Sequence, residues 1–219
     1  MGINKIPVIN SGETELDTRV GLIAPAGFAM RAARYLMEFE CTPEQIAMVA
    51  VKNRQHAGLN PNAQFQTPLT LEQVMASPMI VDPLTRLQCC PIADGASSVI
   101  ICSPDIARRI RKPVHVASAI LCTGSYGNHQ DMVVWETDAR GCRLAYEKAG
   151  IGPEDIDVIE CHDAFTISEI LHYEALGLCG PGEGARVGLA HCMGEDKAGG
   201  LKIKQNRTAG FMYFPFFIN

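Results

Sequence analysis

Residues 157–179 read DVIECHDAFTISEILHYEALGLC, and this stretch carries the strongest indication of the fold. The β-branched and apolar run Asp157–Cys161 predicts a buried strand. Thr166, followed three residues later by Glu169, has the pattern of a capping box that opens a helix through Leu176, with Gly177 after its end. The stretch therefore predicts a strand, a short turn and a helix.

Two helices are expected upstream. Apolar residues at helical spacing predict the first over Ala26–Phe39. Thr42, Pro43 and Gln45 have the pattern of a capping box with proline at the first helical position, which predicts a second helix. Its apolar stripe is expected to pack against the first helix and consists of Ile46, Val49, Ala50 and Ala57.

The middle of the chain has the alternation of an α/β domain. Ser97–Cys102 and Val114–Cys122 are apolar and β-branched, so both are predicted to be strands, with a short basic helix between them. Asp138–Ala149 is predicted to be a helix that ends at Gly150. Strands alternating with helices favour an α/β fold.

Composition excludes several classes of protein. The 219 residues carry a net charge of −5 and are 47% apolar, which is typical of a globular protein and argues against nucleic-acid binding by bulk charge. No apolar run reaches the roughly 18 residues of a membrane span. Nine cysteines without a Cys-x-x-Cys pair indicate reduced thiols, no metal site and a cytoplasmic location.

His162 and Asp163 are the main catalytic candidates, because they lie between a predicted strand end and a predicted helix start. The positive end of the helix favours a neutral imidazole, which can donate a hydrogen bond to a carbonyl oxygen that gains negative charge. Asp163 is expected either to orient this ring or to cap the helix. Alternatively, His162 is a structural residue of the junction.

Several other residues are functional candidates, and none of them decides the function. Cys161 and His162 are adjacent in a predicted strand and point to opposite faces, so they do not form a nucleophile–base pair. Gly180–Gly184 follows a helix and is interpreted as a connector rather than a phosphate-binding loop. Cys89 and Cys90 are assigned to core packing. A solvated loop or a polar ligand-binding wall is expected from His56, Asn60 and Gln64.

Residues 157–179 closely resemble the second half of sterol-carrier-protein-x-type thiolases, in which His-Asp-Cys-Phe replaces the Asn-Glu-Ala-Phe of other thiolases. Here the motif reads HDAF, with alanine in place of the cysteine. Further segments follow the family's order over roughly residues 20–184: TPEQIAMVAVKNRQHAGLNPNAQF (42–65), VMAS (74–77), LQCCPIADGASSVI (87–100) and AYEKAGIGPEDIDVIE (145–160).

The resemblance implies an incomplete thiolase-like α/β fold. Residues 1–112 are expected to form the end of the N-terminal half with its loop excursion over the active site, residues 113–194 part of the C-terminal half, and residues 195–219 a divergent tail. His162 matches the histidine of the oxyanion hole, and Phe165 matches the motif's phenylalanine, expected beside the substrate.

The implied activity is acyl transfer between CoA thioesters in lipid or sterol side-chain metabolism, with coenzyme A only as part of the substrate and no other cofactor. Thiolases also need a nucleophilic cysteine, a Gly-His-Pro histidine and a Cys-x-Gly-Gly-Gly cysteine. The sequence shows none of these motifs, so the chain is expected to be a fragment that is inactive alone.

Two alternatives remain: a thiolase-like aldolase subunit of steroid side-chain degradation, or a non-catalytic acyl-CoA- or lipid-binding remnant. The resemblance implies a homodimer for the full-length protein and allows a small acyl-CoA-binding partner protein, as in the aldolase branch. Eukaryotic relatives are peroxisomal, but this chain ends without a targeting tripeptide.

Overall fold

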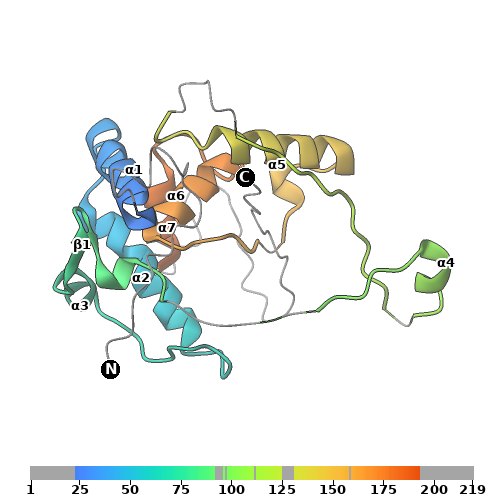
Figure 1. The fold of residues 1–219 in the computed structure, drawn as a ribbon, viewed down its shortest axis with the longest axis horizontal. Helices are drawn as coiled ribbons and strands as arrows, with labels where there is room; N and C mark the ends of the chain where they lie inside the picture. The colour runs from blue at the N-terminus through green and yellow to red at the C-terminus, as the bar shows by residue number, and fades with distance from the viewer. Residues whose placement is uncertain are drawn as a thin grey trace.

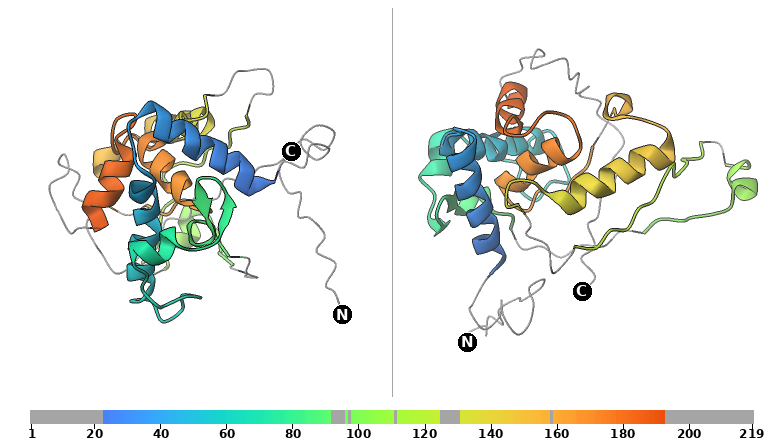
Figure 2. Two further views of the ribbon diagram at one scale, coloured as in Figure 1. Left: turned by 90° about the vertical axis from the view of Figure 1, so that its left-hand side faces the viewer. Right: turned by 90° about the horizontal axis from the view of Figure 1, so that it is seen from above.

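A computed structural model describes residues 23–91, 96, 98–110, 112–124, 131–157 and 159–192 of the chain. Its centre is a cluster of helices, in which α1 (Ala24–Glu38), α2 (Pro43–Ala57), α6 (Thr166–Ala175) and α7 (Gly184–Cys192) lie side by side (Figures 1 and 2). α5 (Glu136–Ala149) packs against α6. No helix in the described part of the chain is long and apolar enough to span a membrane.

Short elements connect these helices. α3 (Leu71–Met75) precedes an antiparallel hairpin of β1 (Met79–Val81) and β2 (Leu84–Thr85), which runs into η1 (Arg86–Gln88). α4 (Pro104–Ala107) stands apart from the helix cluster in Figure 1, and η2 (Pro153–Asp155) lies between α5 and α6.

Local signals placed α1, α2, α5 and α6 correctly, whereas α3 and α7 were not predicted. Thr42 accepts from the backbone N–H of Gln45, whose side chain accepts from the N–H of Thr42, so the predicted capping box of α2 is confirmed. Gly150 ends α5 with a φ of 71°, a left-handed conformation in which glycine carries no Cβ penalty.

The main core lies between α1, α2 and α6. Tyr35 of α1, Ile46 of α2 and Ile170 of α6 are fully buried in it. The predicted stripe on α2 is confirmed only in part: Ile46 and Val49 share this core with α1, whereas Ala50 packs with Val74 in a second cluster. These contacts hold α2 and α6 together and so set the geometry of the site.

The predicted capping box of α6 is wrong. The N-cap residue is Phe165, and no side chain caps this helix. Glu169 points into the protein and forms an ion pair with Lys52 of α2. A buried carboxylate without a cation costs more free energy than a helix terminus without a cap. The contact with Lys52 therefore determines where the Glu169 side chain lies.

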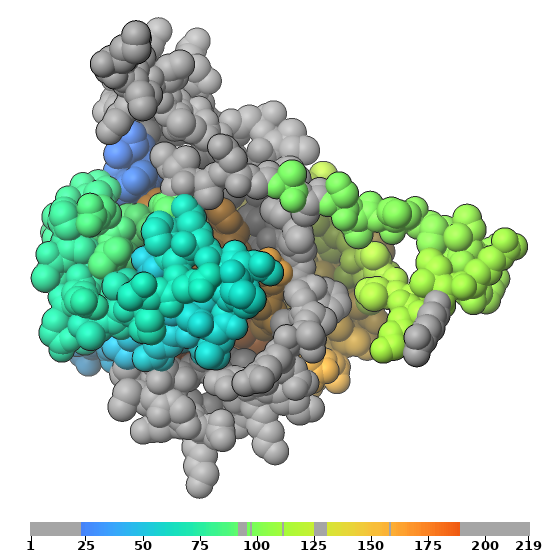
Figure 3. All heavy atoms as spheres, turned by 90° about the horizontal axis from the view of Figure 1, so that it is seen from below, coloured from blue at the N-terminus to red at the C-terminus, as the bar shows by residue number. Residues whose placement is uncertain are grey.

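The predicted strands are not formed. Residues 98–102, 112–122 and 159–161 carry no strand, and Val99, Ile100 and Ile101 are 83, 94 and 82% exposed. Figure 3 shows the green segment around them extending away from the helix cluster. A strand requires a hydrogen-bonded neighbour, and the part of the chain that the structure describes places none beside these runs.

Predictions on residues 193–219 lie outside the described residues. The described cysteines form no disulfide with one another, and their reduced state stays a prediction.

Candidate active site

His162 lies in the loop before α6, with its side chain exposed. The ring nitrogen Nε2 of His172, two turns further along in α6, lies 3.2 Å from the carbonyl oxygen of His162. The backbone carbonyl of His162 is therefore hydrogen-bonded to a buried side chain, while the His162 residue itself is exposed to solvent. This arrangement leaves the imidazole accessible to a ligand.

Asp163 is attached to α2. Its Oδ2 accepts a hydrogen bond of 2.9 Å from Nδ2 of Asn53. The alternative that Asp163 caps α6 is therefore wrong, because Phe165 is the N-cap. Loss of hydration and the negative charge of Glu169 raise the pKa of Asp163.

The residues after Asp163 are held by the segment that follows β2. The N–H of Cys90 donates to the carbonyl of Ala164 at 2.8 Å. The backbones of Cys89 and Phe165 pair in an isolated antiparallel β-bridge. Gln88 accepts a bond of 3.1 Å from the hydroxyl of Thr166. Three separate parts of the chain thus fix the loop that carries His162.

A buried charged cluster lies behind this loop. Nζ of Lys52 contacts Oε1 of Glu169 and donates to the hydroxyl of Tyr173 at 2.9 Å. Tyr173 donates to the same carboxylate, and Nδ2 of Asn53 donates to its Oε2 at 2.8 Å. Burial alone would raise the pKa of Glu169, but the Lys52 ammonium and these hydrogen bonds outweigh burial and lower it.

His172 forms a second buried cluster. Its Nδ1 lies 3.4 Å from Oδ2 of Asp138, which belongs to the first turn of α5. The indole of Trp135 stacks on the ring with centroids 4.8 Å apart. Burial lowers the pKa of His172, although the charge of Asp138 opposes this shift.

The three other polar residues predicted to bind a ligand lie at the end of α2 and in the following loop. They are His56, Asn60 and Gln64, and all three are exposed. Desolvation and the charge of Lys52 lower the pKa of His56, which places it near the buried charged cluster. Asn60 stabilises its own loop, since its Oδ1 accepts from the N–H of Asn62 at 2.9 Å.

Phe165 is buried in the core, with its ring stacked on Phe28 at a centroid distance of 4.5 Å. Its role in binding substrate remains a prediction, as do the roles predicted for His56, Asn60 and Gln64.

Burial makes several thiols poor nucleophiles. It raises the pKa of Cys161 to about 12, with a further contribution from Glu169 and Asp163. It also raises the pKa of Cys89 to about 11. A thiol attacks as the thiolate, so neither cysteine is activated in this structure.

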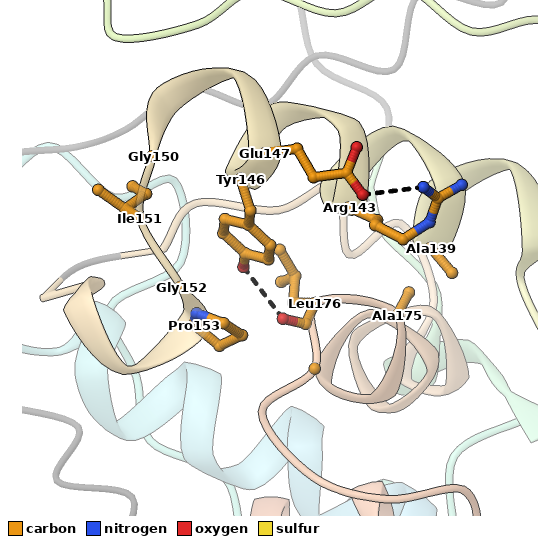
Figure 4. Close-up of a pocket in the computed structure, with 11 residues that line it drawn as sticks. Ala139, Arg143, Tyr146, Glu147, Gly150, Ile151, Gly152, Pro153, Ala175 and Leu176 are labelled. Atoms are coloured by element: carbon orange, nitrogen blue, oxygen red, sulfur yellow. Dashed lines mark hydrogen bonds and ion pairs between the residues drawn. The ribbon is translucent and has the colours of Figure 1, made fainter.

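A pocket lies elsewhere, between α5 and α6 (Figure 4). Its volume is about 400 Å³, and its lining includes Tyr146, Pro153 and Leu176. The hydroxyl of Tyr146 donates to the carbonyl of Leu176 at 3.0 Å, so this polar group already has a partner within the fold. None of the predicted site residues lines this pocket.

Sequence reasoning missed the two buried clusters. Lys52 follows Val49 by three residues on the apolar stripe of α2, and Glu169 stands among Ile167, Ile170 and Leu171. A charged residue on an apolar helix face indicates a buried partner. Among the described residues there is no group of three or more His, Cys, Asp or Glu side chains that could hold a metal ion.

Comparison with known proteins identifies related sequences. Residues 121–203 match the family described as "Thiolase C-terminal domain-like". The chain is 43% identical over 176 residues to the benzoylsuccinyl-CoA thiolase subunit BbsB of Thauera aromatica, covering 79% of this chain and 46% of that subunit. It is 38% identical over 206 residues to an acetyl-CoA acetyltransferase of Methanothermobacter thermautotrophicus, covering 90% of this chain and 54% of that enzyme.

Human sterol carrier protein 2 is 37% identical over 171 residues, covering 74% of this chain and 31% of that protein. A solved structure named Ltp2-ChsH2(DUF35) aldolase matches with a TM-score of 0.73 and 32% identity, over 78% of this chain and 47% of that chain. The predicted thiolase-like fold is confirmed. The chain spans about half the length, or less, of the relatives that it matches.

Proposed function

Because this chain belongs to the thiolase superfamily, we propose that the protein containing it is an acyltransferase that acts on CoA thioesters. The proposed reaction is cleavage of a 3-oxoacyl-CoA by coenzyme A, or condensation in the reverse direction. The observation that carries the proposal is the exposed imidazole of His162 on a loop fixed by His172, Asn53 and Cys90.

His162 has the features of an oxyanion-hole donor. Attack on a thioester or ketone carbonyl places negative charge on its oxygen, and a fixed N–H donor stabilises that charge without reorganising in the transition state. The His162 side chain is exposed, while its main chain is held by a buried group. A protonated ring nitrogen donates the hydrogen bond and need not release its proton.

The proposed reaction also needs a nucleophile that carries the acyl group. Burial raises the pKa of Cys161 to about 12 and those of Cys89 and Cys142 to about 11, so these thiols are poor candidates. The acyl-carrying thiol is proposed to be a different residue.

A second candidate function is carbon–carbon cleavage by an aldolase. It is favoured by the similarity to the solved Ltp2-ChsH2(DUF35) aldolase. A retro-aldol cleavage also develops negative charge on a carbonyl oxygen, so His162 could serve either reaction. The reactions differ in products, since only thiolysis consumes the thiol of coenzyme A.

The remaining properties are proposed by analogy with the relatives. The protein is proposed to use no cofactor beyond the coenzyme A of its substrates, and to act as a homodimer in the cytoplasm. The neighbour named as an Ltp2-ChsH2(DUF35) aldolase and the relative named as a subunit support an additional partner subunit, here proposed to be a small acyl-CoA-binding protein.

The test uses the native gene product that contains these 219 residues. Acetoacetyl-CoA and a longer 3-oxoacyl-CoA are each incubated with coenzyme A, and the free thiol and the thioester products are measured. Acyltransferase activity predicts loss of free thiol together with formation of two shorter thioesters. Cleavage of a 3-hydroxyacyl-CoA to a carbonyl compound with unchanged free thiol would instead support the aldolase.

A further inference from the structure

His172 is a buried residue whose ring nitrogen contacts the backbone carbonyl of His162. The residue is only 2% exposed, although it is polar and lies in the middle of α6. Trp135 stacks on its ring with an interplanar angle of 16°, and Phe28 contacts the indole edge-on. The ring plane of His172 is therefore fixed by packing.

Both ring nitrogens of His172 lie beside acceptor oxygens. The carbonyl oxygen of His162, 3.2 Å from Nε2, can only accept, so Nε2 must carry a hydrogen for this bond to form. Nδ1 lies 3.4 Å from a carboxylate oxygen of Asp138. Asp138 and the His162 carbonyl therefore lie beside different nitrogens of the same ring.

Neighbouring elements supply the other charges around this pair. Arg31 of α1 stacks over the ring of Trp135 and attracts Asp138, while His162 and Asp163 in the loop interact electrostatically with His172. Asn53 and Cys90 hold the two residues after His162, whereas His172 bonds to His162 itself.

We propose that His172 is a positioning residue for His162. Its Nε2–H holds the His162 carbonyl and thereby sets where the exposed imidazole points. A mobile backbone at His162 would leave the imidazole misplaced in the transition state. The effect on turnover rests on the proposed function, but the effect on the loop does not.

The decisive variants are His172→Gln and His172→Asn. The amide nitrogen of glutamine reaches the position of Nε2, whereas that of asparagine reaches only the position of Nδ1. Both side chains are polar and neutral, so they disturb the core similarly. Ile170→Val serves as a control on the same helix, because Ile170 is buried in the main core.

The first readout is amide hydrogen exchange, which requires no activity. The N–H of Cys90 is protected by the carbonyl of Ala164 and reports whether the loop is in place. We expect His172→Asn to speed its exchange about tenfold, and His172→Gln and Ile170→Val to change it less than about threefold. Equal exchange in His172→Asn and His172→Gln would overturn the proposal.

The second readout is steady-state turnover of the native gene product. His172→Asn should lower kcat about tenfold with little change in KM, and His172→Gln should restore most of it. Unchanged kcat in an active His172→Asn enzyme would overturn the positioning role. An inactive wild-type protein whose exchange follows the expected pattern would refute the proposed function and leave the positioning of the loop supported.

Discussion

The side-chain amide of Asn53 donates to the carboxylate of Asp163 at 2.9 Å, across 110 positions of sequence. The same amide donates to Glu169 at 2.8 Å, so it lies between two carboxylates. This contact joins α2 directly to the loop that carries His162. It explains how two neighbouring carboxylates are held together beside the candidate catalytic residue.

Replacing Asn53 by alanine should therefore loosen the link between α2 and the loop. Two carboxylates would each lose a donor, and we expect a loss of about 1–3 kcal/mol in the free energy of unfolding. Asn53→Asp should lower the free energy of unfolding further, since it places a third carboxylate beside those of Asp163 and Glu169. The measurement is urea denaturation, with Asn62→Ala in the exposed loop as control. A wild-type value for Asn53→Ala would contradict the linking role.

Removing one partner of the Lys52–Glu169 ion pair is expected to destabilise the fold strongly. Lys52→Met would leave the Glu169 carboxylate buried without its cation and should cost about 3–5 kcal/mol. The double variant Lys52→Met/Glu169→Leu should recover most of this loss, because no buried charge remains.

The control for this experiment is the pair between Arg34 and Glu38 on the surface of α1, with a distance of 2.7 Å. Arg34→Met should cost less than about 1 kcal/mol, since exposed pairs contribute little. Equal losses in Lys52→Met and Arg34→Met, measured by urea denaturation, would show that burial of the pair does not matter.

The helices could be predicted from the sequence because their signals are local. Thr42, Pro43 and Gln45 form the start of α2 within four residues, and Gly150 ends α5 by its own conformation. The strands could not be predicted in the same way, since a run such as residues 99–102 becomes a strand only beside a partner. Residues 99–102 are apolar, but the local sequence does not determine whether a partner strand lies beside them.

The candidate site was likewise predicted in part. His162 and Asp163 were identified by their position before a helix, and the structure places both in one anchored loop. The residues that anchor them were missed, because His172 and Asn53 reach the loop only after α2 and α6 have packed together. Glu169 was assigned to a local cap since its partner Lys52 is 117 positions away.

Stability should fall in two steps as the pH is lowered. The pKa of His172 is lowered from 6.5, so below that pH the unfolded chain binds a proton that the folded protein does not, and stability falls. The pKa of Glu169 is lowered from 4.5, so its contribution is present above that value and is lost as the pH falls further.

Each step can be removed separately. In urea denaturation at a series of pH values, His172→Gln should flatten the step below pH 6.5, and Glu169→Gln should flatten the step below pH 4.5. Each wild-type slope should not exceed about 1.4 kcal/mol per pH unit for one proton. Unaltered slopes in both variants would assign the acid sensitivity to other groups.

His162 itself should matter for turnover and little for folding. Its side chain is exposed, and the bond from His172 goes to its backbone carbonyl, which alanine retains. A structural residue of the junction would behave in the opposite way, with lost stability and normal turnover in the molecules that remain folded. The two roles can therefore be separated by measuring both properties on one preparation.

In the native gene product, His162→Ala should remove one oxyanion donor and lower kcat by about 10²–10³-fold. The free energy of unfolding should change by less than about 0.5 kcal/mol, as for other exposed positions. His115→Ala, at an exposed histidine in another segment of the chain, should alter neither property. His162→Gln should recover part of the rate, because its amide still offers a donor. Unchanged turnover in a stable His162→Ala protein would remove His162 from the catalytic machinery.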